Sequence, residues 1–576
     1  MYLVCLVRTS NFFREDWDLK RNMQRRWLRK GKKELVKKMT ALGLLSGALF
    51  WGQMAYVAAA GVKPLNENNV AGKMEEAEES IRVNGYVFSG ELPLAEDKLL
   101  EVVAEYLGRQ ATLTDLNAQA DKITQFLRSQ GFFVAFAYIP PQDFTTGMVE
   151  IRIVPGYYGN ITLNNETYID DEIIRREMGI KQGAKISRKD LERGIWLTGD
   201  LSKVEAKTQL KRGTQSGTSD LVIEVKPKGN RLWGFVGVDN GGYLHTGRYQ
   251  YSAFANYASP FGRGDQLSVG GVISNRGTDM WTGAFTYTTP FAAPGNKLGF
   301  SYAKSDYVLG GPFSALGYTG NADIYSLWWQ HNFERSRRFN LYGTLRFDWK
   351  KLDTYANETN FRDPKSSRNW SIGINGDSLD TFASGGKNTF SLTYTGGNLA
   401  IDDAVQSVVD SITNKTEGHF GKYNLGLTRL QRISDRLALF LSYNRQWAEK
   451  NLDSSEKMSL GGPYAVRAYP VGEAAGDDGW QWTTEFRWNV PTKEGDENTW
   501  QLIAFVDGGH INQYHEGNVY GGRNSRSLYG AGIGVNWSNQ DNWAARLHYA
   551  WKLGSEDAES DTDRSGRVWF QLYKFF

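Results

Sequence analysis

The sequence contains very little cysteine and proline, and it has no long internal apolar run. Its 576 residues include 14 prolines and one cysteine, Cys5, which lies upstream of the N-terminal cleavage site that the sequence predicts. Mean hydropathy is −0.49, and no stretch of about 20 apolar residues occurs beyond the N-terminal region. These absences exclude a disulfide framework, thiol chemistry in the mature chain and a membrane protein built from several transmembrane helices.

Motifs of nucleotide use and hydrolysis are also missing. The chain has no GxxxxGK[ST], HExxH or GxSxG pattern. His510 and His515 have no apparent third metal ligand. Residues 561–566 match half of a calcium loop, but Leu572 stands where the loop needs a glutamate. We therefore expect the acidic run 556–563 to be a solvated loop, and we predict no enzyme activity, no cofactor and no metal site.

The N-terminus is predicted to be a secretory leader. Residues 1–38 hold twelve Lys/Arg and four Asp/Glu, and residues 39–62 carry no charge. The small residues at 58–60 suit a signal peptidase, which predicts a signal peptide at 1–60 with an extended basic region. An inner-membrane anchor helix is the alternative. Removing the leader leaves 55 basic and 60 acidic residues, so the net charge changes from +3 to about −5. Nucleic-acid binding thereby loses its electrostatic support.

After a short N-terminal segment at 61–80, the hydrophobic periodicity predicts two small α/β domains, at 81–155 and 156–228. Each has the order strand, helix, helix, strand, strand. The segments predicted for the first are 81–91, 96–108, 113–131, 132–139 and 148–154; those for the second are 161–163, 170–179, 187–201, 204–211 and 221–225. The repeat is one of order rather than of sequence. Two unrelated ferredoxin-like domains are the alternative.

Residues 229–576 are predicted to form a membrane β-barrel of about sixteen antiparallel strands. From 229 onward, apolar and polar residues alternate in segments of ten to seventeen residues, with aromatic residues near the segment ends. The sixteen predicted segments are 232–241, 247–260, 265–275, 279–291, 296–310, 320–334, 339–355, 367–382, 386–399, 420–433, 436–451, 481–491, 500–512, 525–539, 542–554 and 567–576. Short connections alternate with long ones, of which the longest lie at 400–419 and 452–480. Short turns on one rim and long loops on the other are typical of outer-membrane barrels.

The long connection after the eleventh strand contains the most specific motif. It reads LGGPYAVRAYP at 460–470, and FVDGG follows at 505–509 within the thirteenth predicted strand. With these paired motifs and the preceding modules, residues 81–576 resemble the two-partner secretion transporters (TpsB), whose periplasmic modules are POTRA domains. The resemblance implies that the loop folds into the lumen and that its tip, Val466-Arg467-Ala468-Tyr469, meets Phe505, Asp507 and Gly509. Ala468 stands where the family usually has glycine, and alanine adopts positive φ less readily.

Physical arguments agree with this implication. Arg467 needs a partner if it enters a narrow lumen, and a carboxylate satisfies it best. Asp507 at mid-strand is costly towards lipid, so it should face inward. Ile503 and Phe505 share that face, which predicts packing against a loop; a solvated arginine is the alternative. Glu485 and Arg487 on the twelfth strand are also expected to face inward and to join this network.

The chain ends with alternating Phe570, Leu572 and Phe576, which resemble a C-terminal insertion signal. The expected partners are accordingly the barrel-assembly machinery, outer-membrane lipid and a large secreted exoprotein (an adhesin, a haemolysin or a contact-dependent toxin), with no nucleic acid. We predict localisation in the outer membrane, with the POTRA-like domains in the periplasm.

The resemblance implies a transporter that recognises its exoprotein through the POTRA-like domains and passes it unfolded through the barrel. The alternatives are a barrel-assembly or insertase protein of the same superfamily, and a passive diffusion porin. Relatives often begin with a helix that plugs the pore. Because residues 61–80 leave little room for a helix and a linker, we predict either no such helix or one outside the lumen.

Overall fold

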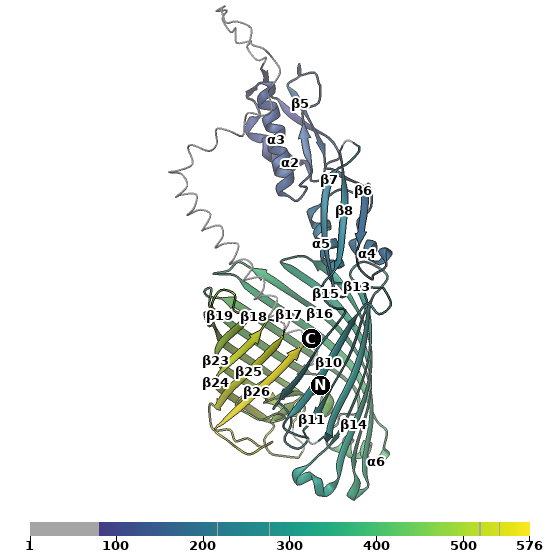
Figure 1. Ribbon diagram of the computed structural model, residues 1–576, viewed down its shortest axis with the longest axis vertical. Helices are drawn as coiled ribbons and strands as arrows, with labels where there is room; N and C mark the ends of the chain where they lie inside the picture. Colours follow the sequence, from purple (N-terminus) through teal and green to yellow (C-terminus); the bar gives the residue numbers. More distant parts are fainter. Residues whose placement is uncertain (1–79, 216, 276, 518–519, 541) are drawn as a thin grey trace, which may run out of the picture. The chain divides into compact units, whose positions relative to one another are not determined.

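The computed structural model describes residues 80–576 apart from 216, 276, 518–519 and 541 (Figure 1). The predicted leader at 1–60, the segment 61–79 and any pore helix formed there lie outside the described residues. Within the described chain, no helix combines the length and the apolarity needed to cross a membrane. Residues Ile81–Phe576 form one compact unit.

The first α/β module has the predicted order, with two additional short strands. Its elements are β1 (Ile81–Arg82), β2 (Gly85–Gly90), α2 (Glu96–Val103), η1 (Ala104–Tyr106), β3 (Gln110–Ala111), α3 (Leu113–Ser129), β4 (Phe136–Tyr138) and β5 (Met148–Val154). The main sheet has the order β2-β5-β4, and β2 and β5 run parallel. Thr112 caps α3 in a capping box with Asp115. The apolar faces of both helices and of the sheet form one buried core that includes Leu99, Ile123 and Ile151.

The second module repeats this design. Its elements are β6 (Tyr157–Asn165), α4 (Asp171–Met178), α5 (Arg188–Gly199), β7 (Val204–Arg212) and β8 (Thr218–Pro227). The sheet order is β6-β8-β7, and the edge strand β6 again runs parallel to the central strand β8. A separate buried core includes Ile174, Ile186 and Leu221. Each module therefore has its own hydrophobic core, as independent folding units do.

The remainder of the described chain contains a closed antiparallel barrel of sixteen strands, as predicted. They are β9 (Leu232–Asp239), β10 (Gln250–Ala258), β11 (Gln266–Ser274), β12 (Gly277–Pro290), β13 (Asn296–Val308), β14 (Tyr318–Arg335), β15 (Phe339–Ala356), β16 (Phe361–Asp380), β17 (Gly386–Ile401), β18 (Gly418–Arg432), β19 (Leu437–Ala448), β22 (Asp478–Asn489), β23 (Asn498–Asn512), β24 (Ser525–Asn539), β25 (Trp543–Lys552) and β26 (Gly566–Phe575). The seam between β26 and β9 closes the barrel in the register from Gln571↔Asp239 to Phe575↔Phe235.

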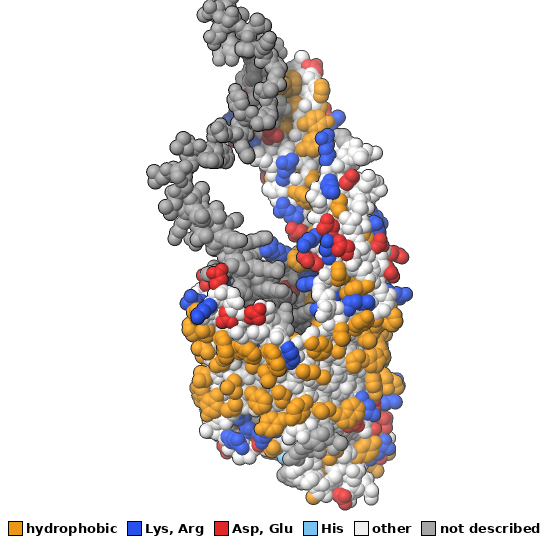
Figure 2. Space-filling view, in the orientation of Figure 1, with side chains coloured by type: hydrophobic (Ala, Val, Ile, Leu, Met, Phe, Trp, Pro, Cys, Tyr) orange, Lys and Arg blue, Asp and Glu red, His pale blue; other side chains and the backbone are white. Residues whose placement is uncertain are grey.

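The wall of the barrel is apolar outside and polar inside. On β16, the outward side chains of Trp370, Ile372 and Ile374 are more than half exposed, whereas the inward Asn369 is buried. On the face of the barrel that Figure 2 shows, the outward hydrophobic side chains form a band across the wall, with charged side chains beyond both borders. This pattern is the one that a bilayer imposes on a transmembrane barrel.

Polar contacts join the second module to the rim that carries the short turns. Arg335, at the end of β14, donates from Nε and Nη2 to the two carboxylate oxygens of Asp200, over 2.7 and 2.6 Å. The Glu177 carboxylate accepts the amide of Gly295, in the turn between β12 and β13, at 2.8 Å. We call the rim that carries the short turns the short-turn rim, and the opposite rim the long-loop rim.

Short elements in two of the long loops were not predicted. Between β17 and β18 lies α6 (Ala404–Ile412), and Asp403 caps it by accepting the amides of Val405 and Gln406. Between β19 and β22 the chain forms η4 (Ser454–Glu456), β20 (Met458–Leu460) and β21 (Ala474–Gly476). All of these elements are too short for hydrophobic periodicity to reveal.

Candidate functional site

The connection between β19 and β22 folds into the barrel. Its strands β20 and β21 pair as a small antiparallel hairpin, with Leu460 opposite Ala474. The tip of the hairpin carries the VRAY segment, whose four residues are at most 4% exposed. The tip packs against inward-facing residues of β23, β24 and β25 in one apolar cluster that includes Phe505, Leu528 and Ala550. We refer to residues 449–477 as the lumen loop.

Arg467 is the most highly bonded side chain at the tip. Its Nε and Nη2 each donate to one oxygen of the Asp507 carboxylate at 2.8 Å, and its backbone amide donates to the same carboxylate at 3.2 Å. Nη1 donates to Glu485 at 2.7 Å. Trp569 Nε1 donates to the Arg467 carbonyl at 2.7 Å. The structure thus brings together the arginine and the aspartate that the sequence predicted as partners, through the bidentate geometry that a guanidinium favours.

Three residues of the FVDGG motif contribute to this contact. The guanidinium of Arg467 lies 3.3 Å from the centre of the Phe505 ring, a cation–π contact. Asp507 is fully buried. A side chain at Gly509 would come within 2.8 Å of Leu460, so the glycine lets the hairpin approach the wall. The motif therefore combines a stacking surface, a counterion and a space for the loop.

Ala468 does not need the glycine conformation. Positive φ angles occur in the tip at Gly461, Gly462 and Gly472, and Ala468 is absent from the described residues with positive φ. Its methyl group instead faces Gly530 of β24, where a Cβ would lie 2.5 Å from it. A glycine in the wall thus accommodates the alanine in the loop.

Glu485 and Arg487 extend the network along β22, on the side that the sequence predicted. The Glu485 carboxylate accepts Arg467 on one oxygen and Arg487 Nε, at 2.8 Å, on the other. The guanidinium of Arg487 lies 4.1 Å from the centre of the Phe440 ring. Both residues are 6% exposed. Two arginines and two carboxylates therefore balance one another inside the wall.

A second charged cluster, which the sequence did not predict, holds the start of the lumen loop. The Glu456 carboxylate accepts hydrogen bonds from Lys350 and from Asn369, the latter at 2.8 Å, and pairs with Lys422 at 2.7 Å. These three partners come from β15, β16 and β18. We call these four residues the base cluster. Inward lysines on two strands, β15 and β18, are a signal that could have revealed it, but nothing in the sequence identifies the matching carboxylate.

The base cluster should persist over a wide pH range. Burial raises the pKa of Glu456, but Lys350 and Lys422 outweigh this effect and lower it from 4.5 to about 2. Because the folded-state pKa is depressed, the stabilisation is complete above the ordinary glutamate range and is lost only as pH falls towards 2.

We expect Glu456→Gln to loosen the lumen loop, because two partly buried ammonium groups lose their carboxylate at a cost of about 1–3 kcal/mol. Conductance in planar bilayers should show more frequent openings, whereas the wild type should behave alike at pH 7 and pH 5. Glu449→Gln, at an exposed carboxylate nearby, is the matched control. Equal opening frequencies in Glu456→Gln and the wild type would contradict this role.

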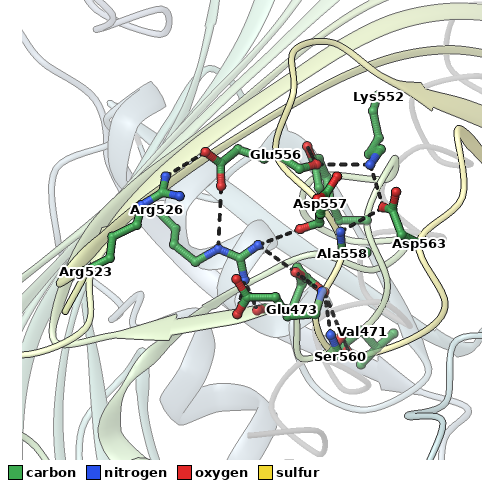
Figure 3. Close-up of polar contacts among 12 residues, drawn as sticks. Val471, Glu473, Arg523, Arg526, Lys552, Glu556, Asp557, Ala558, Ser560 and Asp563 are labelled. Atoms are coloured by element: carbon green, nitrogen blue, oxygen red, sulfur yellow. Dashed lines mark hydrogen bonds and ion pairs between the residues drawn. The ribbon is translucent and has the colours of Figure 1, made fainter. Parts of the chain in front are cut away.

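A third set of contacts covers the lumen loop from the connection between β25 and β26 (Figure 3). The buried Glu473 carboxylate accepts the amides of Glu559 and Ser560 at 2.8 and 3.0 Å. It also pairs with Arg526 at 2.8 Å, and Arg526 donates to the Asp557 carbonyl. We call residues 553–565 the cap.

The expectation that the acidic run 556–563 is merely solvated is wrong. Asp561, whose side chain is 3% exposed, accepts both Arg248 and Arg567. Asp563 pairs with Lys552. The acidic side chains of this run therefore pair with basic side chains from several strands. Among the described residues, no group of three potential metal ligands is close enough to hold an ion.

The C-terminal residues lie in the last strand with the expected facing. Phe570 and Leu572 share the outward face of β26 with the exposed Val568, while Trp569 and Gln571 face inward. Phe576 exchanges backbone hydrogen bonds with Gly234 across the seam, at 3.0 and 3.1 Å. The last residue of the chain therefore contributes to barrel closure.

Comparison with known proteins agrees with this architecture. Residues 217–537 match the family described as haemolysin secretion/activation protein ShlB/FhaC/HecB. Residues 81–156 match the ShlB-type POTRA domain, and 156–228 match a POTRA family described as surface antigen variable number repeat. The heme/hemopexin transporter protein HuxB of Haemophilus influenzae is 27% identical over 485 residues, covering 83% of this chain and 84% of HuxB.

Two solved structures show the same fold at lower identity. CdiB from Escherichia coli has a TM-score of 0.73 and 19% identity, covering 88% of this chain and 93% of that chain. BamA from Haemophilus ducreyi lacking POTRA domains 1–3 has a TM-score of 0.50 and 16% identity, covering 86% and 99%. The family match spans more than half of the chain and includes most of the barrel. The chain therefore belongs to the haemolysin secretion/activation family ShlB/FhaC/HecB and is an outer-membrane transporter of a secreted protein, with its POTRA domains in the periplasm.

Proposed function

We propose that this transporter captures its cargo as an extended chain on the first POTRA domain and passes it unfolded through the barrel. The observation that carries the proposal is the open face of the β2-β5-β4 sheet. The four exposed apolar side chains on this face are 37–47% exposed and are Val87, Phe136, Tyr138 and Met148. A folded periplasmic domain has little reason to expose such a face unless a partner covers it.

The edges of this sheet also suit strand addition. Neither β2 nor β4 contains a charged residue. In the second POTRA domain, by contrast, the edge strand β7 carries Glu205, Lys207 and Lys211, and edge charges oppose pairing with another strand. The other edge, β6, exposes polar side chains. An unfolded partner can add a strand to an uncharged edge and bury apolar side chains on the adjoining face.

We expect the double variant Val87→Lys/Phe136→Lys to abolish cargo binding, because it charges both edges and the face between them. The single variants should identify the edge used. Gln209→Lys, which adds a lysine to the already charged β7 edge, is the matched control. The measurement is retention of the unfolded exoprotein by the purified transporter, together with secretion from cells. Wild-type retention by the double variant would refute capture at this sheet.

Passage through the barrel requires the lumen loop to move. The proposed roles follow from the contacts: the VRAY tip with Phe505, Asp507, Gly509, Glu485 and Arg487 forms a latch, and the cap covers it. The described chain offers no nucleotide-binding motif, so we assign the driving force to folding of the cargo outside the cell.

The remaining partners belong to the same proposal. We propose that Phe570, Leu572 and Phe576 present the insertion signal to the barrel-assembly machinery, and that outer-membrane lipid surrounds the apolar band. The cargo is an adhesin, a haemolysin or a contact-dependent toxin. We assign no catalytic step to the chain.

A further inference from the structure

An uninterrupted aromatic row marks the membrane border on the outside of β13, β14 and β15. Tyr302, Tyr325 and Trp349 are paired in register on these neighbouring strands. Their ring centres lie 4.9 and 5.5 Å apart. On β16, Arg368 lies opposite Trp349, and the outward ring of Trp370, which is 58% exposed, lies opposite Phe347, one step towards the short-turn rim. Because the row lies towards the long-loop rim, it marks the outer border of the apolar band.

Basic side chains follow directly beyond this row. Two residues further along their strands, on the same outward face, lie Lys304 on β13 and Lys351 on β15. Arg368 on β16 is two residues beyond Trp370 in the same direction. Neighbouring strands are about 4.8 Å apart, so the backbones of Lys304 and Lys351 are roughly 10 Å apart, and Arg368 is on the adjacent strand. We call these three residues the outer basic patch.

The patch has one carboxylate among its cations, Asp323, which lies opposite both Lys304 and Lys351 in the strand register. Among the described residues, no ion pair joins any of its three members to a carboxylate. The one acidic residue between them, Asp323, accepts a hydrogen bond from the Tyr302 hydroxyl. The ammonium of Lys351 lies over the Trp349 ring, 4.6 Å from its centre. The next residue inward, Lys350, is paired with Glu456. On the outward face, Arg362 is paired with Asp353.

We propose that the outer basic patch binds the phosphate groups of a phosphorylated lipid in the outer leaflet of the outer membrane. The patch lies where lipid head groups meet the aromatic border, and its cations point towards the lipid rather than into the lumen. Three cations and one carboxylate, which already accepts the Tyr302 hydroxyl, leave a net positive charge that suits a phosphorylated head group. The aromatic row beneath them contacts the upper part of the acyl chains.

We assign a lipid rather than free phosphate as the ligand, because the cations and the aromatic rings form one continuous surface. It depends on the location in the outer membrane and not on capture of cargo. A failed test would therefore leave the proposed export function unaffected.

The test uses the full-length transporter in detergent, with diphosphoryl lipid A as the probe and native mass spectrometry as the readout. The wild type should retain lipid A, and the triple variant Lys304→Gln/Lys351→Gln/Arg368→Gln should not. One cation near an anionic lipid surface changes binding roughly fivefold, so three should lower retention by about 100-fold. Arg445→Gln, at an outward arginine beside Trp447 on β19, is the matched control and should retain lipid A.

Three outcomes would overturn the proposal. Equal retention by the triple variant and the wild type would leave the patch without a role. If the wild type retained dephosphorylated lipid A equally well, the binding would depend on the acyl chains alone and not on the phosphates. Displacement of lipid A by millimolar inorganic phosphate would indicate a free anion site. Heat-modifiable migration on gels verifies that the triple variant is a folded barrel.

Discussion

Replacing Arg467 by alanine should abolish secretion while the barrel remains inserted in the outer membrane. The substitution leaves Asp507 fully buried without its partner and removes one of the two arginines that bind Glu485. Breaking a fully buried pair in this way costs about 3–5 kcal/mol. The wall keeps its strand hydrogen bonds, so the loss falls on the conformation of the lumen loop. Secretion assays combined with heat-modifiable gel migration measure the two effects separately.

Two further variants distinguish charge from geometry. Arg467→Lys keeps the charge but loses the bidentate fork, so we expect partial secretion. The double variant Arg467→Ala/Asp507→Ala removes both charges and should recover part of the stability without recovering secretion. Wild-type secretion by Arg467→Ala would show that the latch has no role in transport.

Deleting residues 81–155 should abolish cargo binding and secretion while the barrel still conducts ions. The first POTRA domain has its own buried core, and the contacts from Asp200 and Glu177 to the short-turn rim belong to the second domain. The deletion therefore leaves the barrel and its neighbouring domain in place. The measurements are pull-down of unfolded exoprotein by the 81–228 fragment, and bilayer conductance of the truncated transporter.

A passive porin predicts the opposite result for this deletion, namely unchanged solute uptake and no protein ligand to lose. A deletion variant that still secretes, together with an 81–228 fragment that binds no exoprotein, would refute capture by the POTRA domain.

Alternation of residues was sufficient to predict the barrel. Every one of the sixteen predicted segments overlaps an observed strand, because a wall between lipid and a polar lumen imposes a strict period of two. The helix α6 escaped prediction because Ala404–Ile412 has nine residues and lies in a long loop. The N-cap residue of this helix, Asp403, is a weak signal when no longer periodic segment follows it.

Contacts within the site could be predicted only where both partners belong to recognisable motifs. The FVDGG and VRAY segments carry a resemblance that joins positions 40 residues apart. Glu456 and Glu473 have no such motif: their partners come from several strands, and only the fold brings those strands together. The cap was misjudged for the same reason, since an acidic run is solvated unless the fold places basic side chains such as Arg526 beside it.

The cap also bears on the step of barrel assembly at which the channel becomes closed. Glu473 is bonded to Ser560, and the Arg467 carbonyl to Trp569, so both ends of the lumen loop's tip depend on the last hairpin of the chain. An assembling barrel that has formed every strand up to β24 still lacks these bonds. If the strands form in chain order, the channel is sealed last, by the same hairpin that closes the seam, and a transporter stalled before that step would leave an open pore in the membrane.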